Sequence, residues 1–119
     1  MKKRLACLAF AFFPLIMICT GCSSSLSNDQ LRFGIEAAKR DLWDEAIFRW
    51  KKILHSSPNS AAAHNNLAVA YEKKGFWEDA KKEYEIALKL SSNDKHIVSN
   101  HKQFMRRYES RKDEITQNR

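Results

Sequence analysis

The sequence predicts an all-α fold, a short array of helical hairpins, on three observations. Similar residues recur in this chain of 119 residues at a constant separation of 34 positions, which we call the repeat offset. It pairs Trp43 with Trp77 and Ala46 with Ala80. Apolar residues in each half recur at the three- and four-residue spacing of a helix. The chain has only three Gly and two Pro, which argues against a loop-rich fold. A period of about 34 residues without strand signals is typical of arrays built from helical hairpins.

Residues 1–21 are predicted to be a cleaved export signal. Lys2, Lys3 and Arg4 give a positively charged start, and the uncharged, largely apolar run 5–18 follows. This run is shorter than the roughly 20 apolar residues of a transmembrane helix. A basic start, a short apolar run and small residues before a polar tract are the pattern of a signal peptide, which is absent from the mature protein.

The apolar run leads into a short motif with two small residues and a Cys, Cys19-Thr20-Gly21-Cys22. This motif resembles the lipobox of bacterial lipoproteins, although the place of Cys19 is more often Leu. The resemblance implies that Cys22 is lipidated, with palmitate among the acyl chains, and becomes the mature N-terminus. An ordinary cleaved signal with an incidental Cys is the alternative. Residues 22–28 would form a Ser-rich tether with a reach of about 20 Å.

The repeat body is expected over residues 29–93, as two repeats at about 27–60 and 61–94. Its four helices are expected at residues 30–40, 44–55, 60–74 and 77–90. Four small residues would let paired helices approach closely: Gly34, Ala46, Ala68 and Ala80. Four large residues would fill the space beside them: Phe33, Trp50, Leu67 and Tyr84. Acidic pairs at 44–45 and 78–79 suit the positive end of each second helix.

These positions resemble the tetratricopeptide repeat family. The second repeat matches the family's signature at Leu67, Ala68, Tyr71, Gly75, Ala80, Tyr84 and Ala87. The first repeat matches at Phe33, Gly34, Ala46, Trp50 and Pro58. The chain departs from the signature at Ala37, Asp41, Ile53 and Ser92. The resemblance implies that the first helix of each repeat lines a concave groove, which holds an extended peptide or a helix.

Residues 94–112 are predicted to form a fifth helix that caps the array, with a frayed tail at 113–119. Its apolar face has helical spacing, at Ile97, His101, Phe104 and Tyr108. Its other side is basic, with Lys102, Arg106, Arg107, Arg111 and Lys112. Because repeat arrays commonly need about three units for stability, self-association or stabilisation by a partner remains open.

The resemblance implies a set of groove residues on the first helices and the cap: Leu31, Ile35, Lys39, Asn65, Val69, Glu72, Lys73, Gln103 and Arg106. Such a groove would be partly apolar, with basic groups toward one side. Asn66 matches the Asn with which some relatives bind a C-terminal carboxylate. Leu31 and Ile35 replace the Lys and Asn of that clamp, so this kind of recognition is not expected. Trp43 and Trp77 are expected to pack the hairpin turns.

The sequence predicts neither an enzyme nor a bound cofactor or metal. It contains no phosphate-binding loop, no HExxH and no nucleophile elbow. No two of its four His have the i, i+4 spacing of a helical metal pair. Binding is therefore the function that the predicted scaffold offers.

The formal charge of +7 is not evidence for nucleic-acid binding, because export would separate the protein from nucleic acid. Removing residues 1–21 leaves 18 basic residues against 14 acidic ones. The surviving excess lies in residues 95–119, with seven basic and three acidic residues. The charge thus comes from the signal and from the last helix.

Two functions remain open at this point. The first is a lipid-anchored envelope adaptor whose groove binds a peptide or helix of another protein and supports assembly of secretion, pilus or cell-wall machinery. The second is a membrane-surface or self-associating structural role for the basic C-terminal helix. By resemblance to lipoproteins, Ser23 after Cys22 favours the outer membrane, facing the periplasm, in a cell with two membranes. In a cell with one membrane, the anchor would lie on its outer face.

Overall fold

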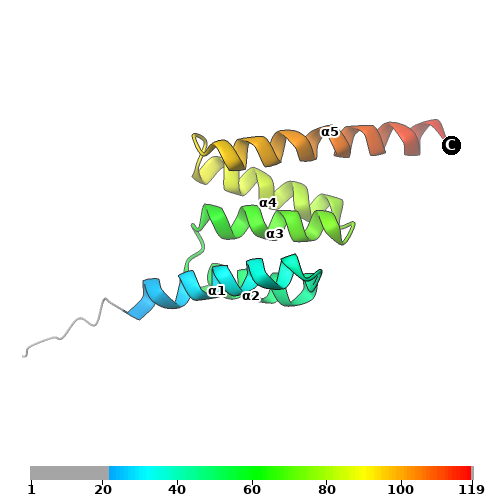
Figure 1. The fold of residues 1–119 in the computed structure, drawn as a ribbon. Coiled ribbons are helices and arrows are strands. Elements are labelled where there is room, and N and C mark those ends of the chain that lie inside the picture. The colour runs from blue at the N-terminus through cyan, green and yellow to red at the C-terminus, as the bar shows by residue number, and fades with distance from the viewer. Residues whose placement is uncertain (1–21, 119) are drawn as a thin grey trace, which may run out of the picture.

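The computed structural model describes residues 22–118, which form five helices and no strand (Figure 1). The helices are α1 (Cys22–Lys39), α2 (Trp43–Ser56), α3 (Ala61–Lys73), α4 (Trp77–Leu90) and α5 (Lys95–Gln117). The predicted all-α fold is confirmed. The predicted signal segment, residues 1–21, lies outside the described residues. None of the described helices is long and apolar enough to cross a membrane.

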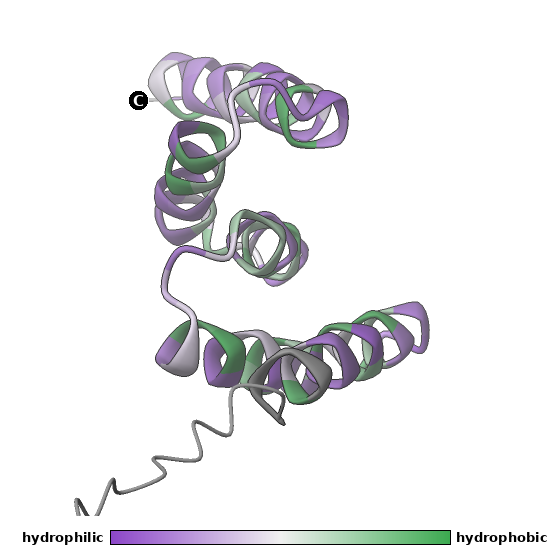
Figure 2. Cartoon of the chain, turned by 90° about the vertical axis from the view of Figure 1, so that its left-hand side faces the viewer, coloured by the Kyte–Doolittle hydropathy of each residue, from purple (hydrophilic) through white to green (hydrophobic). Residues whose placement is uncertain are grey.

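Consecutive helices pack against one another, so the chain folds as a stack. In Figure 2 the helices α3 and α4 stand between the α1–α2 pair and α5. The first helices of the hairpins also meet, because α1 contacts α3 and α3 contacts α5. This arrangement places α1, α3 and α5 next to one another, which is what a helical repeat-like array requires.

The predicted bounds hold for the three middle helices and differ at both ends. α1 begins at Cys22 and not at residue 30, so the expected extended tether is helical. α5 continues to Gln117, so most of the expected frayed tail is helical too. Neither 22–30 nor 112–117 contains Gly or Pro, and the chain therefore meets no strong helix breaker there. In the last turns, the Thr116 hydroxyl donates to the carbonyl of Lys112.

The core consists of two buried clusters that meet on α3. The first lies between α1, α2 and α3: Ala37, Ala46, Trp50, Ile53, Ala63, Leu67 and Ala70. The second lies between α3, α4 and α5: Ala68, Ala80, Tyr84 and Phe104. The small residues set the helix spacing. A Cβ on Gly34 would lie 2.7 Å from Cε2 of Trp50, so only glycine permits this approach of α1 to α2.

Three of the four large residues expected to fill the core are buried, and Phe33 is not. Its side chain is 49% exposed, whereas its repeat equivalent Leu67 is 2% exposed. Leu67 packs in the cluster that includes α2, but within the described residues no helix covers the corresponding side of α1. The Phe33 ring is instead approached by the guanidinium groups of Arg32 and Arg49, 5.4 and 5.8 Å from its centroid.

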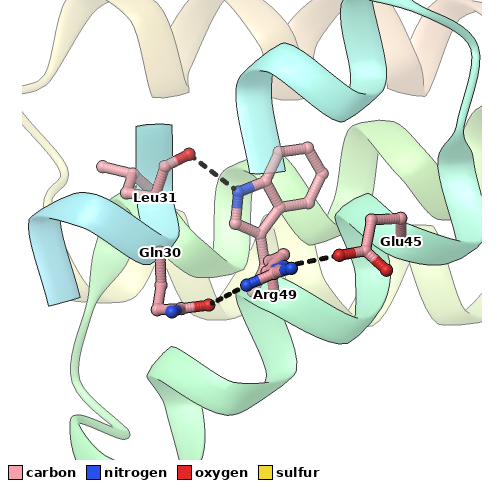
Figure 3. Close-up of polar contacts among 5 residues, drawn as sticks. Gln30, Leu31, Glu45 and Arg49 are labelled. Atoms are coloured by element: carbon pink, nitrogen blue, oxygen red, sulfur yellow. Dashed lines mark hydrogen bonds and ion pairs between the residues drawn. The ribbon is translucent and has the colours of Figure 1, made fainter. Parts of the chain in front are cut away.

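Hydrogen bonds connect α1 to α2 (Figure 3). Arg49 donates to Gln30 of α1 at 3.2 Å and to Glu45 of its own helix at 2.6 Å. The indole nitrogen of Trp50 donates to the carbonyl of Leu31 at 3.5 Å. Leu31 is thereby held against the first core cluster, where its side chain is partly buried.

The two hairpins turn in the same way, although only one has glycine at the turn. Gly75 has a φ of 78°, and Asp41, its equivalent in the first repeat, has a φ of 58°. After each, a backbone amide returns to the helix, from Leu42 to Ala37 at 3.0 Å and from Phe76 to Tyr71 at 2.9 Å. The missing glycine therefore leaves the turn unchanged, because Asp is among the residues that tolerate this left-handed conformation best.

His64 joins the two helices of the second repeat to the loop that precedes them. The residue is buried; its Nδ1 lies 2.5 Å from Oε2 of Glu83 on α4, and its Nε2 lies 2.8 Å from the carbonyl oxygen of Pro58. The ring thus links α3 to α4 and to the loop between the repeats. Among the described residues, no group of three or more His, Cys, Asp or Glu could hold a metal ion.

Candidate functional site

The candidate site is a groove across α1, α3 and α5, formed by two adjoining pockets. The pocket of about 310 Å³ between α1 and α3 is lined by Ile35, Ala38, Lys39, Trp43, Trp50, Asn65, Asn66, Val69 and Asn100. The pocket of about 450 Å³ between α3 and α5 is lined by Val69, Glu72, Lys73, Trp77, Tyr84, Asn100, Gln103 and Arg107. Because Val69 and Asn100 line both, the two pockets lie side by side.

Seven of the nine side chains implied by the family resemblance line this groove: Ile35, Lys39, Asn65, Val69, Glu72, Lys73 and Gln103. Leu31 does not line either pocket, because it packs into the core. Arg106 does not either: it lies at a different hollow, with His101 and Met105. In a helix of 3.6 residues per turn, one residue rotates the side chain by about 100°. On α5 the groove is accordingly lined by Arg107, the neighbour of Arg106, together with Asn100 and Gln103.

Eight lining residues lie outside the predicted site, and five of them share a pattern in the sequence: Trp43, Trp77, Asn66, Asn100 and Arg107. A signal for them was present in the sequence, because each recurs with a similar residue at the repeat offset. Trp43 pairs with Trp77, Asn66 with Asn100, and Lys73 with Arg107. The two Trp side chains are half-buried. They pack against the two core clusters and line the groove as well.

The charge of the one carboxylate among the groove-lining residues is compensated by a neighbouring guanidinium group. Glu72 has a side chain that is 12% exposed, and it accepts from Nε and Nη2 of Arg107 at 2.5 and 3.2 Å. It also accepts from the hydroxyl of Tyr84 at 3.2 Å. The hydrogen bond to Glu72 raises the pKa of Arg107 further. Burial, followed by the charge of Glu72, raises the pKa of Tyr84, which therefore stays a donor.

Amide side chains occupy the middle of the groove. Asn65 is 8% exposed and accepts from Nδ2 of Asn100 at 3.1 Å, so it ties α3 to α5. It also donates to Oδ1 of Asn66 at 3.3 Å. Asn66 and Asn100 are half-buried and line the pocket. Amides in this position can donate to and accept from the backbone of an extended peptide.

Two comparisons with known proteins bear on this chain. Residues 32–112 match the family described as Domain of unknown function (DUF6340). A stretch of 39 residues is 49% identical to part of the Protein O-mannosyl-transferase TMTC4 of Mus musculus. That stretch is 33% of this chain and spans only 5% of the mouse protein.

The match to the family runs from α1 into α5 and therefore includes every wall of the groove. It also covers well over half of the chain. The protein therefore belongs to the family described as Domain of unknown function (DUF6340).

Proposed function

We propose that this protein is a lipid-anchored adaptor of the cell envelope, which holds a peptide or a helix of another protein in its groove. The observation that carries the proposal is the groove itself. It runs across α1, α3 and α5 and is lined by the exposed Ile35, by half-buried apolar side chains and by exposed basic ones. Such an adaptor would support the assembly of an envelope complex of the secretion, pilus or cell-wall kind.

We further infer that the array is of the tetratricopeptide type. The equivalent turns at Asp41 and Gly75 support this inference. The buried small residues Ala46 and Ala80, which are both fully inaccessible, support it too. Both repeats therefore fold alike at positions where the family's signature places a turn or a close helix approach. The concave side of such an array is the surface formed by its first helices.

The anchor at Cys22 is supported by the motif at residues 19–22, with a basic and apolar segment before it. Since α1 begins at Cys22, no extended linker separates the lipid from the first helix, and the chain rises from the anchor by only about 1.5 Å per residue. The groove would then face partners close to the membrane surface. We place the protein at the outer membrane, facing the periplasm, in a cell with two membranes. In a cell with one membrane, we place it on the outer face.

Metabolic labelling with a fatty-acid probe tests the anchor. The wild-type protein should carry the label and sediment with membranes, and Cys22→Ala should lose both properties. Fractionation of the labelled protein then tells the outer from the inner membrane. A wild-type protein without label would refute the anchor while leaving the groove proposal untouched.

Crosslinked capture from the native membranes tests the groove. Ile35 is 38% exposed and lines the pocket between α1 and α3, so Ile35→Asp should release a specific partner without unfolding the protein. The matched control is Lys102→Glu, which changes the charge of an exposed residue on the other side of α5. Circular dichroism should show equal helix content in both variants.

The two variants also separate the alternatives. Loss of the partner in Ile35→Asp alone supports the groove. Equal capture by Ile35→Asp and wild type would contradict it. In the unlipidated Cys22→Ala protein, loss of liposome binding on addition of Lys102→Glu would instead support a membrane-surface role for α5.

A further inference from the structure

Three basic side chains stand at equivalent places along the groove. Lys39, Lys73 and Arg107 follow one another at the repeat offset, so each occupies the same position on its own helix, α1, α3 or α5. All three line the groove and are exposed. We call them the basic row. Because α1 contacts α3 and α3 contacts α5, the row crosses the groove from one wall to the other.

The charge of the basic row is only partly compensated. Arg107 is engaged by Glu72, and Lys39 lies 2.8 Å from Glu36 in a pair whose side chains are both more than half exposed. An exposed pair of this kind contributes little and opens easily. The side chain of Lys73 has no hydrogen bond or ion pair within the described part of the chain. The groove therefore presents two positive charges for an anionic partner.

Beside the basic row, the groove offers an apolar site and amides. Ile35 and Val69 face the pocket between α1 and α3 together with the Trp43 indole. Asn66 and Asn100 lie on the same pocket. An occupant that satisfies these groups has carboxylates, at least one apolar side chain, and a backbone free to hydrogen-bond with amides. An extended peptide meets all three requirements.

The distance between neighbouring helices of the groove sets the distance between the carboxylates of a peptide that would bind the basic row. Packed helices lie about 8–10 Å apart. An extended chain in the polyproline II conformation advances about 3.1 Å per residue and places every third side chain on the same side. One step along the basic row therefore corresponds to about three residues of an extended peptide. A helical peptide would need carboxylates about seven residues apart for the same step, at 1.5 Å per residue.

We propose that the groove binds an extended acidic segment of another protein, with carboxylates about three residues apart and an apolar residue between or beside them. The proposal rests on the groove function stated above and adds the chemistry of the partner. Lys73 is the principal contact for a carboxylate, and Lys39 exchanges Glu36 for a second one. The apolar residue enters the pocket beside Ile35.

Fluorescence anisotropy with labelled peptides of about ten residues tests the proposal, with the full chain purified in detergent. The test peptide carries one Leu and two Glu three positions apart. Its controls replace both Glu by Gln, place the two Glu next to each other, or place them seven positions apart in a helix-forming sequence. The first peptide should bind tightest, and its affinity should fall with salt.

Two charge reversals in the protein complete the test. Lys73→Glu should weaken the test peptide about tenfold, which corresponds to about 1.4 kcal/mol. Lys82→Glu, on the exposed side of α4, is the matched control and should leave binding unchanged. Both residues are exposed, so neither change should alter the thermal unfolding midpoint. A peptide with Lys in place of Glu should bind Lys73→Glu better than it binds wild type.

The outcomes separate this proposal from the groove function on which it rests. Equal binding of the Glu and Gln peptides, or preference for the helical one, would overturn the acidic extended segment. If Ile35→Asp still released the native partner, the groove function would stand. The mass of the wild-type protein in solution could also increase with concentration. If Lys73→Glu abolished that increase, the groove would bind a second copy of the protein, and the proposal would be wrong.

Discussion

Tyr84 joins the core to the groove through a single side chain. Its ring is 1% exposed and lies 4.9 Å from the ring of Phe104, and its hydroxyl donates to Glu72 at the edge of the groove. Glu72 in turn accepts from Arg107. A groove residue of α3 is thus oriented by α4 and α5 together. Removal of the hydroxyl should therefore affect both stability and the groove.

The raised pKa of Tyr84 predicts a loss of stability in alkali. The unfolded chain releases this proton near the ordinary pKa of 10.0, whereas burial and Glu72 keep it on the folded protein. Above a pH of about 10 the unfolded state therefore binds fewer protons, and the free energy of unfolding falls as pH rises. Tyr84→Phe should lower stability by about 1 kcal/mol near neutral pH. The free energy of unfolding of Tyr84→Phe should then fall less than that of wild type between neutral pH and about pH 11.

Urea unfolding of both proteins at the two pH values measures this difference. Other groups titrate in the same range, but they are common to wild type and variant and cancel in the comparison. Parallel loss of stability in the two proteins would show that Tyr84 keeps no proton advantage in the folded state.

At the scale of the helices, the caps show which ends are fixed by local sequence. The Asp94 carboxylate accepts from the amides of His96 and Ile97, at 2.8 and 3.2 Å, and starts α5. The Ser60 hydroxyl accepts from the amide of Ala63 at 3.3 Å and starts α3. The second helix of each repeat has no side-chain cap and has two acidic residues in its first turn instead.

Asp94→Ala should destabilise the protein by about 1 kcal/mol, because two amides at the start of α5 lose their acceptor. The thermal unfolding midpoint measures the effect. Asn93→Ala, one residue earlier and exposed, is the matched control and should change the midpoint little. Asp94→Asn, which keeps an accepting oxygen, should recover most of the loss. A midpoint in Asp94→Ala equal to that of wild type would show that packing alone fixes this end.

The ends of the whole array are protected against further stacking. α1 has Asp29 and Glu36 at the places where α3 has the buried Ala63 and Ala70. α5 has Lys102 at the place where α3 has the buried Ala68. Charged side chains at these places oppose the close approach of another helix, because burying them without a partner is costly. This favours the interpretation in which two repeats and a cap are stable without self-association.

The protein in detergent should therefore sediment as a monomer at micromolar concentration. The measurement is analytical ultracentrifugation over a wide range of concentrations, with the detergent contribution subtracted. A mass that rises with concentration would show that the exposed Phe33 or the outer side of α5 makes a contact despite these charges. Phe33→Ser would then identify which end is involved.

The sequence by itself determined the helical hairpins, most of the core and seven groove positions. The hairpins and the core follow from local rules: apolar spacing selects helices, and small residues facing large ones at a constant offset select the hairpin. The groove positions follow from the resemblance to the tetratricopeptide repeat family. The repeat offset from Lys73 could have placed Arg107, and not Arg106, in the groove. The sequence could not decide where α1 begins or whether Phe33 is covered. Each of these depends on which neighbouring element is present. A face is buried only when another helix packs on it, and that is a property of the whole array.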